Sequence, residues 1–130
     1  MKYLDDSVVE AAALTAILDK FSKTLHKVEE RLTEANKYKL EFEYHADPIH
    51  NVFLSWRKPV KARKKKRCRV CIRVVDTGID RPLGDLPIGL RIEYAKYLMP
   101  FLQAFKEHMS EKIDEMEDKV TQLKADMECY

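Results

Sequence analysis

The sequence predicts an α+β fold in the order α-β-β-β-α, in which a three-stranded antiparallel meander packs against two long amphipathic helices. Apolar residues recur every three or four positions near both ends of the chain, which is the spacing of one helix face. Between them, residues 40–75 alternate apolar and polar side chains, as half-buried strands do. The length of 130 residues suits a single domain, 1–130, with a modest core.

The first helix is predicted over residues 7–38, with Asp6 or Ser7 as its N-cap. No Pro or Gly interrupts residues 7–37. Two sets of apolar residues with a spacing of seven form one stripe along this helix: Ala11, Leu18, Leu25 and Leu32 in the first set, and Leu14, Phe21, Val28 and Ala35 in the second. Such a heptad pattern is typical of a helical bundle or a coiled-coil-like interface.

Residues 39–75 predict the three strands. The first two, Leu40 to Tyr44 and Val52 to Arg57, are separated by Asp47-Pro48, a pair that favours a turn. A basic loop over residues 58–66 leads to the third strand, Arg67 to Val75, and such short connections predict antiparallel pairing. The residues expected to face the core are Leu40, Phe42, Tyr44, Val52, Leu54, Trp56, Cys68, Val70, Ile72 and Val74.

Residues 76–89 hold all three glycines of the chain and predict a connection without regular structure. A long helix is predicted next, over residues 90–128, with a bend near Pro100. In the alternative, Pro100 lies in the first turn of a helix that begins there. The apolar stripe of this helix runs from Leu98 to Met127, with one eleven-residue interval from Leu102 to Ile113 that interrupts the heptad spacing.

The two helices are longer than three short strands can cover, so we expect a homodimer or a larger homo-oligomer. A helical hairpin within one chain is the alternative, and the sequence leaves both open. The residues expected at the interface between subunits are Leu18, Phe21, Leu25, Val28, Leu32, Phe105, Met109, Ile113, Met116, Val120 and Leu123.

The net charge of +2 conceals a basic middle segment. Residues 48–75 contain no Asp or Glu but hold ten of the 24 Lys and Arg residues. These ten are the candidate polyanion-binding residues: Arg57, Lys58, Lys61, Arg63, Lys64, Lys65, Lys66, Arg67, Arg69 and Arg73. Lys and Arg neutralise phosphates, and Arg can hold them bidentately. Tyr44, Phe53 and Trp56, on neighbouring strands, are candidates for stacking on bases.

These features predict a non-enzymatic, homo-oligomeric binding protein for nucleic acid or a nucleotide phosphate. Otherwise the basic loop is a solvated hairpin tip, or it meets the acidic helix of another subunit. A second hypothesis is a small interaction or inhibitor protein, of the phage accessory type, that acts by binding another protein. A third is a small enzyme that uses Glu41, Glu43, His45 and Arg73 on the outer face of the sheet.

The enzyme hypothesis is the weakest, because the sequence has no glycine-rich phosphate loop and no nucleophile motif. Cys68 and Cys71 have the spacing of half a zinc site, but strand residues three apart face opposite sides and no second cysteine pair follows. We expect a buried Cys68 beside a partly exposed Cys71. The sequence therefore predicts no catalytic residues, no metal and no cofactor.

The chain has no apolar run of 18 residues, and its N-terminus lacks a signal-peptide pattern, so we expect no membrane partner. An odd number of cysteines, three, suits a reducing compartment better than a disulfide framework. We therefore expect a cytoplasmic protein. In a eukaryotic host the expectation extends to the nucleus, because residues 61–67 have the composition of a nuclear localisation signal.

Overall fold

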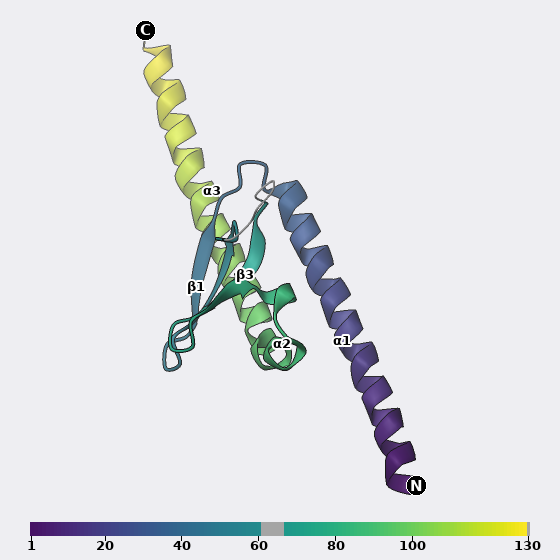
Figure 1. The fold of residues 1–130 in the computed structure, drawn as a ribbon. Coiled ribbons are helices and arrows are strands. Elements are labelled where there is room, and N and C mark those ends of the chain that lie inside the picture. Colours follow the sequence, from purple (N-terminus) through teal and green to yellow (C-terminus); the bar gives the residue numbers. More distant parts are fainter. Residues whose placement is uncertain (61–66, 130) are drawn as a thin grey trace.

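The computed structural model describes residues 1–60 and 67–129 and confirms the α+β class. A long N-terminal helix and a long C-terminal helix enclose the sheet in the sequence (Figure 1). In chain order the elements are α1 (Lys2–Ala35), β1 (Phe42–Asp47), β2 (Val52–Arg57), β3 (Arg69–Val74), β4 (Ile79–Pro82), the 3-10 turn η1 (Leu83–Asp85), α2 (Ile88–Tyr94), the 3-10 turn η2 (Ala95–Tyr97) and α3 (Leu98–Glu128).

The sheet has one strand more than the sequence predicts. Its order is β1-β2-β3-β4, and each strand pairs antiparallel with the next. The additional strand, β4, lies within residues 76–89, where a connection was expected. Gly78, with a φ of 74°, adopts the left-handed conformation that the turn after β3 requires. Pro82 is tolerated because β4 is an edge strand.

The apolar face of the sheet is the one that the alternation predicts. Phe42, Trp56 and Val70 lie opposite one another on β1, β2 and β3, and the remaining core positions follow with a period of two. The prediction was wrong for Leu40, which precedes β1 and is exposed. Every other residue expected on this face is buried or packs partly buried against the core.

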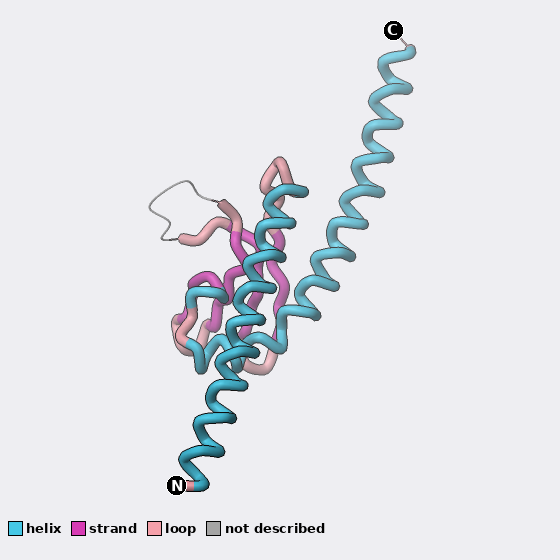
Figure 2. The backbone as a smooth tube through the Cα atoms, turned by 90° about the vertical axis from the view of Figure 1, so that its right-hand side faces the viewer, coloured by secondary structure: helices cyan, strands magenta, loops and turns pink. Residues whose placement is uncertain are grey.

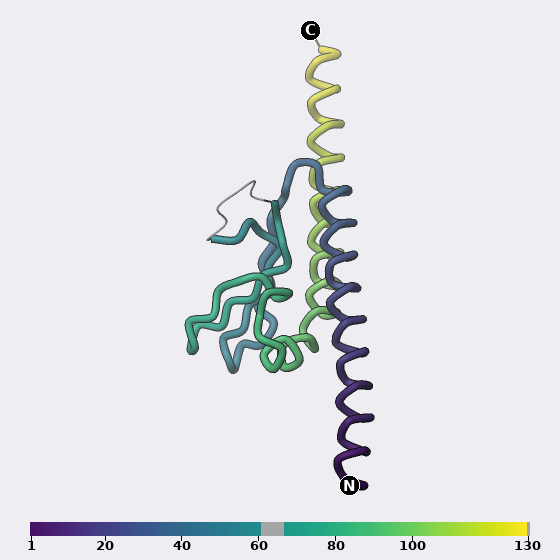
Figure 3. The backbone as a smooth tube through the Cα atoms, turned by 45° about the vertical axis from the view of Figure 1, so that its right-hand side comes forward, coloured from purple at the N-terminus to yellow at the C-terminus, as the bar shows by residue number. Residues whose placement is uncertain are grey.

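Both long helices cover the apolar face of the sheet. α3 contacts β1 and β2 and contributes Leu98, Phe101 and Phe105 to the core, while α1 contributes Leu25. The view in Figure 3 shows the sheet on one side of both helices. Figure 2 shows that the two helices run in the same direction but are staggered along it, so that their free ends extend to opposite ends of the molecule.

The helix boundaries differ from the predicted ones: α1 ends at Ala35 rather than at residue 38, α2 begins at Ile88 rather than at residue 90, and two further differences concern Ser7 and Pro100. α1 begins at Lys2, so Ser7 lies inside the helix, where its hydroxyl donates to the Tyr3 carbonyl at 2.6 Å instead of capping an end. The predicted 90–128 helix is broken at Ala95–Tyr97, and Pro100 lies in the first turn of α3. This is the alternative that the sequence left open. No helix in the described parts of the chain combines the length and apolarity needed to cross a bilayer.

Candidate functional site

The three strand arginines of the candidate site point away from the core, Arg57 and Arg73 on the outer face of the sheet and Arg69 at the edge of β3 beyond the end of β4. Arg57 and Arg69 are register neighbours on β2 and β3, and Arg73 lies further along β3 beside Asp80 of β4. Arg57 forms an ion pair with Asp80, and its Nε donates to the Ser55 hydroxyl at 2.9 Å. The charge of Arg57 is therefore balanced within the sheet.

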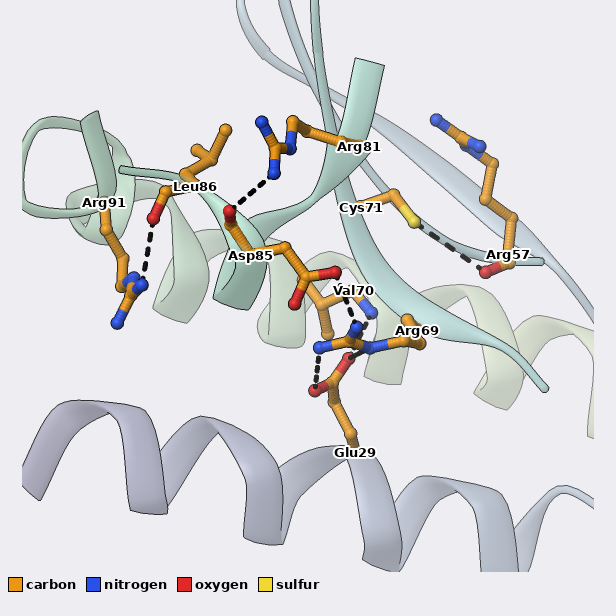
Figure 4. Close-up of polar contacts among 9 residues, drawn as sticks. All are labelled: Glu29, Arg57, Arg69, Val70, Cys71, Arg81, Asp85, Leu86 and Arg91. Carbon is orange, nitrogen blue, oxygen red and sulfur yellow. Dashed lines mark hydrogen bonds and ion pairs between the residues drawn. The ribbon is translucent and has the colours of Figure 1, made fainter. Parts of the chain in front are cut away.

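Arg69 is held by two carboxylates (Figure 4). Its Nε donates to Oε2 of Glu29 on α1 at 3.2 Å, and its Nη1 donates to Oδ2 of Asp85 at 3.0 Å. The same Glu29 oxygen accepts the backbone N–H of Val70 at 2.9 Å. Burial opposes the charge of Arg69, but the hydrogen bond and the charge of Glu29 outweigh it, so the pKa of Arg69 is raised. Arg69 thus joins α1 to the sheet.

Arg73 is also engaged within the chain. Its guanidinium lies 4.2 Å from the centroid of the Phe53 ring, and its Nη2 donates to Oε1 of Glu43 at 3.4 Å. His45 stacks on Phe53 with 4.1 Å between ring centroids. Phe53 therefore has an arginine and a histidine as neighbours, an arrangement that stabilises the outer face and occupies the ring that was a stacking candidate.

The other two stacking candidates point to the opposite face of the sheet. Trp56 is 1% exposed, so the prediction that it stacks on bases was wrong: its ring is a core residue. Tyr44 is partly buried against the same core. An alternating strand places residues 44 and 56 on the apolar face together, so this outcome was implicit in the period-two pattern.

The rest of the candidate site belongs to the connection between β2 and β3. Lys58 and Arg67 are exposed, and among the described residues neither side chain forms an ion pair. The other five candidates, Lys61, Arg63, Lys64, Lys65 and Lys66, lie outside the described residues. Of the ten basic candidates, three are thus paired within the chain, two are exposed with no ion pair among the described residues, and five lie outside the described residues.

Cys68, directly before β3, and Cys71, within it, point to opposite faces of the sheet, as expected for residues three apart. Cys71 is fully buried, so the expectation of a partly exposed thiol was wrong; it lies opposite Ser55 of β2 and Pro82 of β4. Burial raises the pKa of Cys71 to about 11, which leaves the thiol protonated and inert at neutral pH. Residues 1–60 and 67–129 contain no group of three potential metal ligands.

The apolar stripes of the two helices fall into a covered part and an exposed part. Leu25 and Phe105 are buried in the core of their own chain, so these two predicted interface residues are not available to a second subunit. Leu18, Phe21, Val28, Leu32 and Met109 are partly buried. The predicted interface residues that remain exposed are Ile113, Met116, Val120 and Leu123, at 57%, 55%, 44% and 60%.

No protein-family model, curated protein or solved structure matches this chain. What the chain does must therefore be inferred from its own geometry. The two features that stand out are the concentration of basic residues in the sequence between β2 and β3 and the exposed apolar residues on the described helices.

A further polar cluster was not predicted. Asp47, at the end of β1, accepts hydrogen bonds from the Tyr97 hydroxyl at 2.8 Å and the backbone N–H of Ile49 at 3.0 Å, and it pairs with the His50 ring at 2.8 Å. The turn preference of Asp47 was visible in the sequence, but Tyr97 is 50 residues away. Burial and the Asp47 carboxylate raise the pKa of Tyr97 to about 12. The cluster fixes the β1–β2 turn to η2.

We expect the Asp47 cluster to make stability depend on pH below about 4. The hydrogen bonds from His50 and Tyr97 hold the pKa of Asp47 well below its usual range, so the native state favours the carboxylate. This stabilisation is complete above the unfolded-state pKa, about 3.9, and is lost as the pH falls toward the lower native pKa. Urea unfolding between pH 7 and pH 2 will show a shallower decline for Asp47→Asn than for the unaltered protein. Asp118→Asn, an exposed change on α3, should leave the decline unchanged; if both variants behave alike, Asp47 is not responsible.

Proposed function

We propose that this chain is a non-enzymatic, homo-oligomeric binding protein that engages a polyanion, either nucleic acid or a nucleotide phosphate. The contact surface is the segment from Lys58 to Arg67, which we call the basic segment. One observation carries the proposal: Arg57, Arg69 and Arg73 have carboxylate partners within the chain, whereas the other seven basic residues of the region lie together in the basic segment.

The charge distribution supports a polyanion as the ligand. The basic segment contains no Asp or Glu, and seven like charges within ten residues repel one another. A chain of phosphates relieves this repulsion and releases its own counterions on binding. Because Arg57, Arg69 and Arg73 already have carboxylate partners, we leave them out of the proposed contact and assign them to holding the sheet together.

We expect binding to short nucleic acids to weaken linearly with salt on a double-logarithmic plot. Fluorescence anisotropy with single- and double-stranded DNA and RNA, at several salt concentrations, measures the slope. Changing Lys64, Lys65 and Lys66 together to Gln should reduce the slope by about 3, one for each lost phosphate contact.

The matched control changes Lys20, Lys23 and Lys27 to Gln, three exposed lysines of α1. This variant carries the same change in net charge but leaves the basic segment intact, so its slope should equal that of the unaltered protein. If the slope falls equally in both triple variants, binding depends on net charge alone and not on the basic segment. No binding at low salt would remove nucleic acid from consideration, and inorganic phosphate and nucleotides would then be titrated.

The exposed helix stripes favour a second candidate function, a protein that acts by binding another protein. Exposed apolar residues on a helix are typical of an interface with a partner helix or groove. A partner recovered by pulldown at high salt, and lost when Val120 is changed to Glu, would support this candidate.

The three free thiols fit either function in a reducing compartment such as the cytoplasm.

A further inference from the structure

We infer that the free end of α3, residues 110–128, packs antiparallel against the same segment of a second copy of this chain. In this pairing, the C-terminal end of each helix enters an apolar groove at the base of the free end of the other. The inference rests on the homo-oligomeric part of the proposed function and specifies which surface forms the assembly.

No helix or strand of residues 1–60 and 67–129 covers the free end of α3. Figure 2 shows it extending away from the sheet and from α1. Every residue from Ser110 to Cys129 is exposed. Yet the segment carries an apolar stripe of Ile113, Met116, Val120, Leu123 and Met127, with exposed fractions from 44% to 68%. Most helical stability in proteins comes from packing an apolar face, so burial of this stripe against a partner would stabilise the segment.

The spacing of this stripe is the same in both directions. From Met109 to Met127 the apolar residues are separated by four, three, four, three and four positions. When a second copy is reversed, Met109 therefore lies opposite Met127, and Ile113 lies opposite Leu123. Met116 lies opposite Val120, and each pairing occurs twice about a two-fold axis. A stripe that matches its own reverse forms a closed, isologous contact.

A groove lies where this pairing places the end of the second helix. It has a volume of about 460 Å³ and lies between α3 and the segment where α1 ends. Its apolar lining comes from both sides: Leu32, Ala35, Tyr38 and Leu40 on one, and Phe105, Met109, Ile113 and Met116 on the other. Met109, Ile113 and Met116 both line the groove and belong to the stripe. The groove is thus continuous with the stripe, and Met127 of the second copy, opposite Met109, would fill it.

The charges at the groove match the helix end that it would receive. Lys37 and Lys112 are among the groove residues, whereas Asp126 and Glu128 flank Met127 at the end of α3. The antiparallel pairing brings these opposite charges together at both ends of the contact. It also places the two sheets at opposite ends of the helix pair.

The free end of α1 also exposes apolar residues, among them Val8, Val9 and Ile17, but these do not continue the heptad stripe of that helix. At positions equivalent to the α3 stripe it carries Leu4, Ser7, Ala11 and Leu14. A serine and an alanine bury less apolar area than the methionines and branched residues of α3. We therefore assign the contact to α3.

The mass of the protein in solution tests the contact surface. Light scattering after gel filtration, over a wide range of protein concentration, should give twice the 15.3 kDa of one chain. Val120→Glu places a charge at the centre of the contact and should give a monomer. The matched control is Ala125→Glu, which adds the same charge on the opposite side of the helix and should leave the dimer intact.

The native cysteines test the direction of the pairing. Cys129 is exposed at the end of α3, while Cys68 and Cys71 are buried, so a spin label on the folded protein reacts at Cys129. In the antiparallel pair the two labels lie about 33 Å apart along the helix axis, from a rise of about 1.5 Å per residue. In a parallel pair they would lie side by side, about 10 Å apart.

The outcomes separate this inference from the proposed function. A monomer at every concentration would overturn both the homo-oligomer and the α3 pairing. A dimer that survives Val120→Glu, or one with adjacent Cys129 labels, would overturn the α3 pairing alone and leave a homo-oligomer with another interface. A dimer that is lost in Val120→Glu, retained in Ala125→Glu, and carries distant labels supports the inference.

Discussion

Replacing Glu29 with alanine is expected to lower the free energy of unfolding by about 3 kcal/mol. Glu29 is 7% exposed, and its carboxylate serves both the guanidinium of Arg69 and the backbone N–H of Val70. Alanine leaves a partly buried cation with only Asp85 as partner, and it leaves a backbone donor in the core with no acceptor. The effect falls at the lower end of the range for buried pairs because Arg69 retains some contact with water.

Two further variants separate the contributions of charge and hydrogen bonding at Glu29. Glu29→Gln keeps an acceptor for Val70 but removes the charge that faces Arg69, so we expect an intermediate loss. Glu30→Ala is the matched control, since Glu30 is exposed and its pair with His26 lies at the surface, and it should change stability by no more than about 0.5 kcal/mol. Urea unfolding at one protein concentration measures all three. If Glu29→Ala and Glu30→Ala lower the free energy of unfolding equally, the contacts of Glu29 do not stabilise the fold.

The sequence predicted the strand faces because period-two alternation is a local property. Val70, Ile72 and Val74 point to the core for the same reason that Arg69 and Arg73 point away from it. The fourth strand has no such signal, since Ile79–Pro82 is short and carries two charged residues. What makes it a strand is the free edge of β3 that it pairs with, and that edge exists only once the sheet has formed.

The candidate site could be predicted only in part, for a related reason. The concentration of positive charge was visible in the composition, but the partners of the arginines were not. Glu29 lies 40 residues before Arg69, and Asp80 lies 23 residues after Arg57. No spacing rule connects residues so far apart. The strand arginines therefore looked like free charges in the sequence, and the fold makes them internal ion pairs.

The heptad spacing likewise predicted the helices but not which parts of them are covered. Leu25 and Ile113 occupy equivalent places in their stripes, yet Leu25 is 1% exposed and Ile113 is 57% exposed. The difference comes from the width of the sheet, which covers only the C-terminal part of α1 and the N-terminal part of α3 (Figure 1). Periodicity indicates that a face will be buried, but it does not say by what.

The covered part of α3 leads to the second large effect, which we expect at Phe101. Phe101→Ala should lower the free energy of unfolding by about 4 kcal/mol, as expected when a large buried aromatic residue leaves a cavity. Phe101 is fully buried, and its ring centroid lies 5.9 Å from that of Phe42 on β1. The contact joins α3 to the strand beneath it, so the cavity would weaken the attachment of the helix to the sheet.

Phe101 and Ile113 together separate folding from assembly on one helix. In the Val120→Glu background, where we expect a monomer, Ile113→Ala should change stability by no more than about 0.5 kcal/mol, because Ile113 is 57% exposed within its own chain. Phe101→Ala should keep its full effect there, because its contacts lie within one chain. Denaturant unfolding of the two double variants measures both values. A large loss at Ile113 in the monomer would mean that the free end of α3 folds back onto its own chain, and it would contradict the division of α3 into a core segment and an assembly segment.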